Sequence, residues 1–252
     1  MRLLAEGRTA EVFIWDEGRV LKLDRPEWTG LSHYEAGVLE RIAATGVPVP
    51  NVFDTVTVDG RSGVVLEHLE GPSLAQALQD RPDRGARQAV DFVEFHCLIH
   101  RPVTGLPDQV ELLRANIDRT GLTSVTKREL VTMIDDLDDG ERVLCHGDLN
   151  AENVIITANG PVAIDWLTAT VGVPAADFAR TLLLLSWPDG MGADPSPFVD
   201  TVRRHGAGRR GLDEHQLANW VRIVAAARLD EGFTGAAAER LVALATGRTL
   251  NE

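Results

Sequence analysis

This chain of 252 residues has few cysteines, no long apolar run and no sustained apolar stretch among its first residues. The two cysteines, Cys97 and Cys145, are too few for a disulfide framework and lack metal-ligand spacing, which favours a reducing cytoplasm. The apolar segment 181–187 is far too short to span a bilayer and predicts a turn of a buried helix. Charges within residues 1–6 leave no sustained apolar region there, so a secretory signal is not indicated.

Positive charge is scarce as well. The chain has 25 lysine and arginine residues against 38 aspartate and glutamate residues, which gives a formal net charge of −13 at pH 7. Nucleic acids and anionic membranes attract Lys and Arg clusters, so we expect neither as a partner. This acidity suits a cationic or polyhydroxy small molecule, and it indicates no particular oligomeric state. The C-terminal acids that could line an amine-binding cleft, unless they are simply solvated, are Asp189, Asp194, Asp213, Glu214, Asp230 and Glu231.

A Walker loop, G-x-x-x-x-G-K-[ST], is also absent, which argues against a P-loop nucleotide-binding fold. The chain has instead the segment 146–155, HGDLNAENVI, followed by IDW at 164–166. The apolar residues 154–156 and 162–164 predict two strands of a hairpin, joined by the turn-forming pair Asn159-Gly160.

Three polar side chains flank this predicted hairpin. Asp148 and Asn153 precede its first strand and Asp165 follows its second, so we expect them to converge when the strands pair. Gly147 lets the chain turn sharply, so that Asp148 can point away from the preceding apolar strand. Magnesium prefers hard oxygen ligands, a few from protein and the rest from phosphate and water, so the three side chains fit a phosphate-transfer site.

The spacing of these residues resembles a known motif. A His-x-Asp step, an Asn five residues after the Asp and a second Asp 17 residues after it resemble the catalytic loop and metal-binding Asp of the protein-kinase-like fold. With Gly147 where protein kinases have Arg, the pattern most closely resembles the aminoglycoside phosphotransferase and choline kinase superfamily, above all its aminoglycoside phosphotransferase family. The resemblance implies that Asp148 orients and deprotonates a hydroxyl while Asn153 and Asp165 hold Mg²⁺. It also implies that His146 is a scaffold residue.

The N-terminal part supplies the other half of such a site. Residues 3–15 predict strand, turn and strand, and residues 19–23 predict a third strand with Lys22 between apolar neighbours. The resemblance implies that Lys22 binds the nucleotide phosphates and that Glu35 on the next helix holds it. Alone, Lys22 would fit a surface lysine on an edge strand. The apolar stripe expected on that helix comprises Tyr34, Val38, Leu39 and Ile42.

Two further segments resemble nucleotide-binding elements. The turn at residues 7–10 can cover phosphates through its N–H groups and the Thr9 hydroxyl, but a tight structural hairpin explains it equally well. Residues 63–71 resemble a strand that runs into a hinge, where the Glu67 carbonyl and the Leu69 N–H would bond the adenine edge. An ordinary strand-to-helix connection is equally compatible.

The remaining sequence predicts helices. One covers residues 86–100, with His96 expected as a core histidine, and another covers 124–139, with a capping box from Thr126 to Glu129. The acids at its end are expected to be a solvated surface. The segment 172–180 resembles a family motif in which Asp177 caps the next helix and braces the catalytic loop.

Together these elements predict an α+β, two-lobed protein-kinase-like fold. We expect residues 1–70 to form a small nucleotide-binding lobe with an antiparallel sheet and one helix. Residues 71–252 would form a larger, mainly helical lobe that carries catalysis and substrate binding, and 213–246 should fold into two helices.

The expected activity is transfer of the γ-phosphoryl group of ATP, or GTP, with Mg²⁺, to a hydroxyl of a small molecule. Within this class, inactivation of an aminoglycoside-like antibiotic competes with metabolic phosphorylation of an amino alcohol, a sugar or a glycated amine. A second class is a catalytically silent, kinase-like module that binds nucleotide.

Overall fold

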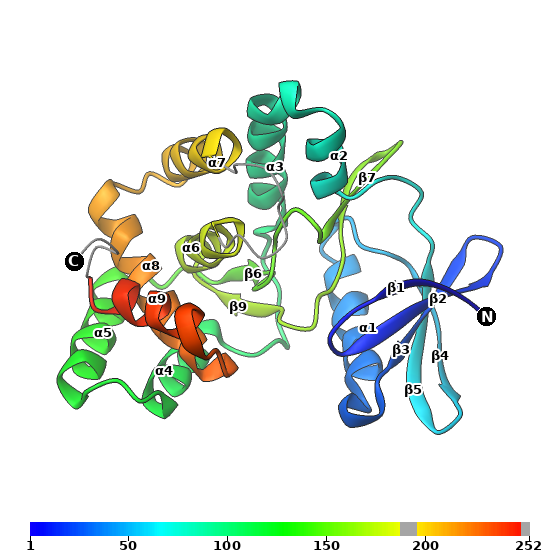
Figure 1. Ribbon diagram of the computed structural model, residues 1–252, viewed down its shortest axis with the longest axis horizontal. Coiled ribbons are helices and arrows are strands. Elements are labelled where there is room, and N and C mark those ends of the chain that lie inside the picture. Colours follow the sequence, from blue (N-terminus) through cyan, green and yellow to red (C-terminus); the bar gives the residue numbers. More distant parts are fainter. Residues whose placement is uncertain (187–195, 248–252) are drawn as a thin grey trace.

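A five-stranded antiparallel sheet and one helix make up the N-terminal part of the computed structural model, which describes residues 1–186 and 196–247 (Figure 1). The strands lie in the order β1-β2-β3-β5-β4. Their bounds are Arg2–Glu6 for β1, Ala10–Asp16 for β2, Arg19–Asp24 for β3, Val52–Val58 for β4 and Arg61–Glu67 for β5. The sequence reasoning did not anticipate β4, which forms the far edge of the sheet.

The alternation of β3 decides where its lysine lies. Leu21 and Leu23 pack with Val65 in a small apolar cluster on one face of the sheet. Lys22 alternates with these residues and shares the opposite face with Val20, which belongs to the main core. Because β3 lies between β2 and β5, Lys22 is on a central strand, and the interpretation as an edge-strand surface lysine is wrong.

Helix α1, Leu31–Ala43, packs against β3, β4 and β5 through a face that differs from the expected stripe. Val38, Leu39 and Ile42 are buried as expected, but the Tyr34 residue is 44% exposed and Glu35 only 1% exposed. Glu35 replaces Tyr34 on the inward face because it has a cationic partner there.

The larger part is mainly helical, with α8 packed against α4, α5, α6 and α9 (Figure 1). Its helices are α2 Leu74–Asp80, α3 Gly85–Ile99, α4 Gln109–Arg119, α5 Ser124–Leu137, α6 Pro174–Leu185, α7 Ser196–Arg209, α8 Glu214–Arg228 and α9 Gly235–Ala245. Two strand pairs join them: β6 Val143–Cys145 with β9 Thr170–Gly172, and β7 Val154–Thr157 with β8 Gly160–Ala163. Short 3-10 turns are η1 Pro26–Trp28, η2 Pro82–Arg84 and η3 Leu229–Glu231.

Local details correct two of the expected signals. Thr123, not Thr126, caps α5, and its side chain accepts a hydrogen bond from the Thr126 N–H at 3.2 Å. The hairpin is present, but Thr157 pairs with Gly160, so the two turn residues are 158 and 159, one position earlier than expected. The two helices expected within 213–246 are present as α8 and α9.

The two parts share one main apolar core, and the segment that connects them packs closely against β7. Val20 and Leu39 of the N-terminal part belong to the same buried cluster as Phe92 and Trp166 of the larger part. In the connection, Gly71 has φ +147°, and a Cβ there would lie 2.1 Å from the carbonyl oxygen of Ile156 on β7. Only glycine allows this approach. The boundary expected between residues 70 and 71 falls in this connection and stays a prediction.

Among the described residues, no helix is long and apolar enough to cross a membrane. The helix turn expected at 181–187 is the last part of α6, which ends at Leu185; residue 187 lies outside the described part of the chain. His96 is fully buried, as expected for a core histidine.

Candidate active site

Lys22 connects three segments that are distant in sequence. Its Nζ lies 2.6 Å from Glu35 Oε2 on α1 and 2.9 Å from Asp165 Oδ1 just after β8. Burial alone would lower the pKa of Lys22, but the two carboxylates outweigh burial and raise it, so the ammonium is stably charged. Burial raises the pKa of Glu35, and the charge of Lys22 opposes this effect.

Glu35 also reaches the segment that follows Asp165. Its second oxygen, Oε1, accepts a hydrogen bond from the Trp166 N–H at 3.1 Å, and the Trp166 indole donates to the Ala163 carbonyl at 2.9 Å. Asp165 has φ +63°, a conformation that is uncommon for residues other than glycine. Such backbone conformations persist where the surroundings hold them, and they cluster at functional sites. The carboxylate of Asp165 is therefore aimed at Lys22 by a fixed backbone.

The loop before β7 places Asp148 beside Asn153. The Asn153 Nδ2 donates to the Asp148 carbonyl at 2.9 Å and to its carboxylate oxygen Oδ2 at 3.2 Å. Gly147 has φ +77°, and a Cβ there would lie 2.5 Å from the Thr168 carbonyl oxygen, so glycine is required. Burial raises the pKa of Asp148; the nearby Arg180 opposes this and Asp165 adds to it. A raised carboxylate pKa suits a group that accepts a proton.

His146 lies beneath this loop as a neutral scaffold. Its Nε2 bonds the Ile164 carbonyl at 3.1 Å, and its Nδ1 accepts from the Asp148 N–H at 3.2 Å. Burial lowers the pKa of His146, in agreement with a neutral ring. The ring packs against Trp166 with centroids 4.3 Å apart. His146 thus joins the Asp148 backbone to the segment that carries Asp165.

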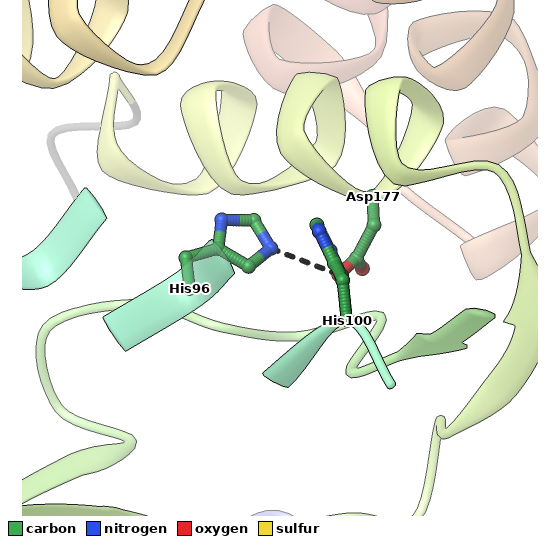
Figure 2. A group of neighbouring side chains, drawn as sticks. All are labelled: His96, His100 and Asp177. Carbon is green, nitrogen blue, oxygen red and sulfur yellow. Dashed lines mark hydrogen bonds and ion pairs between the residues drawn. The ribbon is translucent and has the colours of Figure 1, made fainter. Parts of the chain in front are cut away.

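Asp177 braces the same loop from α6. Its Oδ1 accepts from the Gly147 N–H at 2.8 Å and its Oδ2 from the His146 N–H at 3.2 Å. Figure 2 shows the rings of His96 and His100 beside this carboxylate, and their Nε2 atoms lie 2.9 and 3.2 Å from Oδ2. Burial would raise the pKa of Asp177, but the hydrogen bonds from His100 and His96 hold it well below its usual range.

The expected helix-capping role of Asp177 is wrong. Pro174 is the first residue of α6, and the preceding Val173 has no capping side chain, so Asp177 lies one turn inside the helix. Its carboxylate is therefore directed at His146 and Gly147 in the loop before β7 and not at the helix end.

The three residues expected around the nucleotide base and phosphates lie apart from these contacts. Thr9 is in the turn between β1 and β2, where its carbonyl accepts from the Arg25 N–H at 2.8 Å. The Glu67 carboxylate bonds the Asn51 side chain at 2.7 Å at the end of β5. Leu69 is half-buried in the connection to α2. The structure thus brings together Lys22 with Glu35 and Asp165, and Asp148 with Asn153.

A model of the phosphotransferase enzyme family matches residues 1–216 of the chain. The chain belongs to this family. The curated relatives include the EKC/KEOPS complex subunit BUD32 of Yarrowia lipolytica, which is 28% identical over 155 residues, 60% of this chain and 53% of that protein. The chain spans about half the length of this curated relative.

Solved structures confirm the two-lobed, kinase-like fold of the phosphotransferase. Aminoglycoside phosphotransferase APH(3'')-Id from Streptomyces rimosus is 17% identical, with a TM-score of 0.60 over 90% of this chain and 92% of that chain. Choline kinase LicA from Streptococcus pneumoniae is 14% identical, with a TM-score of 0.60 over 98% and 93% of the two chains. The amicoumacin kinase hAmiN is 15% identical, with a TM-score of 0.62 over 97% and 86%.

Sequence reasoning missed one residue next to Asp148 in the phosphotransferase. Arg180, on α6, donates through Nε to the Gly147 carbonyl, and its Nη2 lies 3.9 Å from Asp148 Oδ1. Arg180 ends the segment 172–180, in which only Asp177 was given a role. Its position three residues after Asp177 could have marked it, because residues three apart share one face of a helix.

The C-terminal acids of the phosphotransferase differ in their surroundings. Glu231 Oε1 lies 2.5 Å from Arg180 Nη1, so it is close to the loop that carries Asp148. Asp230 bonds Arg119 at 2.7 Å. Asp213 and Glu214 are at the exposed start of α8, while Asp189 and Asp194 lie outside the described residues.

Proposed function

We propose that this family member is an ATP-dependent kinase that transfers the γ-phosphoryl group to a hydroxyl of a small molecule. The observation that carries the proposal is the contact of Lys22 with both Glu35 and Asp165, which joins β3 and α1 to the segment after the catalytic hairpin. A charged lysine between two carboxylates suits a group that will bind phosphate oxygens, since the ammonium is already formed and positioned.

Magnesium fits the residues beside this lysine. Asn153 turns its amide nitrogen toward Asp148, which leaves the amide oxygen for a cation. Asp165 gives one oxygen to Lys22, and its side chain is 43% exposed, so its other oxygen can bind a metal that phosphates also coordinate. Asn153 and Asp165 would hold the ion, which would supply charge neutralisation at the transferring phosphoryl group.

Asp148 would orient the acceptor hydroxyl and take its proton as the bond to phosphorus forms. Its backbone is held by the ring of His146, and its carboxylate by the Asn153 amide. Most of the rate enhancement would then come from positioning and electrostatics, because phosphoryl transfer requires little covalent help from the protein.

The nucleotide would lie between the sheet and the hairpin of β7 and β8. We propose that the Thr9 hydroxyl covers phosphates, and that the Glu67 carbonyl and Leu69 N–H bond the base of ATP, or of GTP. The connection after β5 supports this assignment, because it carries Leu69 along the boundary between the two parts of the fold.

For the acceptor we propose an aminoglycoside-like or other amine or polyhydroxy compound, phosphorylated in the cytoplasm. The net charge of −13 supports a cationic or neutral acceptor. Among proteins of this fold, the Streptomyces rimosus enzyme has been solved with ADP and streptomycin, and LicA is a choline kinase. A metabolic amino alcohol, a sugar and a glycated amine are the competing acceptors.

Acceptor-dependent nucleotide turnover tests the proposal. Purified protein is assayed with Mg²⁺ and ATP or GTP against panels of aminoglycosides, choline-like amines, sugars and glycated amines. Asp148→Ala should lower kcat more than about 100-fold on the active acceptor while leaving nucleotide affinity nearly unchanged, because only the proton-accepting group is lost. Full activity of this variant would refute the assigned base. Nucleotide binding without any phosphorylated product would instead indicate a silent kinase-like module.

A further inference from the structure

Both polar groups of the peptide bond between Gly147 and Asp148 are hydrogen-bonded to side chains. Its carbonyl accepts from Arg180 Nε, and its N–H donates to the ring of His146 at 3.2 Å. The preceding N–H, that of Gly147, donates to Asp177 at 2.8 Å. Asp177 and Arg180 lie three residues apart on one face of α6, and together they bind the N–H and the carbonyl of Gly147.

Arg180 has two further partners besides the carbonyl. Its Nη1 bonds Glu231 Oε1 at 2.5 Å, and its Nη2 lies 3.9 Å from Asp148 Oδ1. Glu231 is held in turn by Arg228, whose Nε lies 3.3 Å from Glu231 Oε2. The side chain of Arg180 is 20% exposed and that of Glu231 29%, so this cluster is partly shielded from solvent and its geometry is restricted.

We propose that Arg180 is a positioning residue for Asp148, and that Glu231 of η3 holds Arg180 in its working orientation. This assignment rests on the proposed role of Asp148. The planar guanidinium binds a carbonyl through one nitrogen and a carboxylate through another, so the direction of the third nitrogen, beside Asp148, is fixed. Glu231, in the C-terminal segment, thereby sets the orientation of the loop that carries Asp148 through its contact with Arg180.

The neighbouring pair of Arg119 and Asp230 provides a matched control. It also joins an arginine to η3, at 2.7 Å, but the Arg119 side chain is 56% exposed and lies on α4. Exposed pairs of this kind contribute little to stability, and this pair does not touch the catalytic loop. Arg119→Met therefore removes an arginine that is bound to the same 3-10 turn, without disturbing Asp148.

Steady-state kinetics test the positioning role. Arg180→Met should lower kcat roughly 10- to 100-fold, the scale expected from a misplaced reacting group, with the KM for nucleotide unchanged. Arg180→Lys should recover part of the loss, because one ammonium can bond either the carbonyl or Glu231 but cannot reproduce the fork. Glu231→Gln should give a smaller drop than Arg180→Met, and Arg119→Met none. Wild-type kcat in Arg180→Met would overturn the proposal.

Amide hydrogen exchange tests the same proposal without turnover. In Arg180→Met and Glu231→Gln, the catalytic-loop amides of Gly147 and Asp148 should exchange faster than in the wild type, while Arg119→Met should not change them. If the wild-type protein phosphorylates no acceptor, the proposed function fails, but this measurement still decides whether Arg180 fixes the loop. Unchanged exchange in Arg180→Met would refute the inference even in an active enzyme.

Discussion

Glu35 and Asp177 are both almost fully buried, each 1% exposed, yet the protein holds the two carboxylates in different ways. Glu35 is bound by one ammonium and one backbone N–H, and Lys22 shares that ammonium with Asp165. Asp177 is bound by four donors, two ring nitrogens and two backbone amides. Burial dominates at Glu35, where the pKa is raised, whereas hydrogen bonding dominates at Asp177, where it is held far down.

The ion pair of Lys22 with Glu35 is suited to exchange its partner, whereas the hydrogen bonds to Asp177 are suited to hold the loop permanently. Lys22 can leave one carboxylate and turn to phosphate oxygens while keeping the other, so its ion pair suits a site that binds and releases ligands. Four donors share the buried carboxylate of Asp177, and its loss would leave several buried polar groups unsatisfied. We therefore expect stability to depend more on Asp177 and catalysis more on Lys22.

Replacing Asp177 should have the largest effect on stability. Asp177→Ala leaves four donors without an acceptor, and at about 1 to 3 kcal/mol for each buried group the free energy of unfolding should fall by at least about 4 kcal/mol. Urea denaturation measures the loss. Asp177→Asn, which keeps one acceptor oxygen, should lose less. A loss below about 1 kcal/mol in Asp177→Ala would show that the loop is held mainly by other contacts.

Removing Lys22 should lower the free energy of unfolding by less than removing Asp177, and a second substitution should restore much of the loss. Lys22→Met leaves the buried Glu35 without its cation, a change that costs about 3 kcal/mol. Adding Glu35→Gln removes the uncompensated charge, so the double variant should regain much of that stability while staying inactive. Urea denaturation and turnover assays on the four proteins of this cycle give the coupling. Additive losses would contradict a paired role for these residues.

The smallest effect expected near neutral pH is a pH dependence of stability near Asp177. Burial lowers the pKa of His96 from 6.5 to about 3. Between these values the unfolded chain binds a proton that the folded protein does not, so the free energy of unfolding falls as pH drops below 6.5, by about 1.4 kcal/mol per pH unit for one proton. His96→Gln should flatten this dependence by one proton, whereas the exposed His215→Gln should not. Equal slopes in both variants would place the acid sensitivity elsewhere.

The sequence predicted the elements that carry the site better than it predicted their orientation. The hairpin of β7 and β8 followed from two short apolar runs with a turn-forming pair between them, and the meeting of Asp148 with Asn153 followed from their spacing. The pairing of Lys22 with Glu35 came from the family resemblance, because nothing local to either residue specifies a partner 13 residues away in sequence.

Three of the errors have physical causes of the same kind. Tyr34 was expected in the apolar stripe of α1 and Glu35 was not part of it, but the ammonium of Lys22 makes burial of the Glu35 carboxylate favourable. Asp177 was expected to cap α6, but Pro174 starts the helix and moves Asp177 one turn inward. Arg180 was missed because its partners come from two distant segments. These three errors concern charged residues that make tertiary contacts, whereas the errors at the α5 cap and at the hairpin turn are local ones.

The close approach of Gly71 to β7 has a consequence for motion. A backbone that leaves no room for a Cβ beside the Ile156 carbonyl is fastened to the larger part of the fold, and the Ile156 N–H adds a bond to the Pro72 carbonyl at 2.9 Å. The His68 N–H in turn bonds the Gly18 carbonyl of the sheet at 2.9 Å, so any rotation of the sheet over the helical part would be absorbed at residues 69 and 70. The hairpin that follows Asn153 belongs to the helical part and Lys22 to the sheet, so an opening of the fold would separate the lysine from Asn153 and Asp165 in a single step.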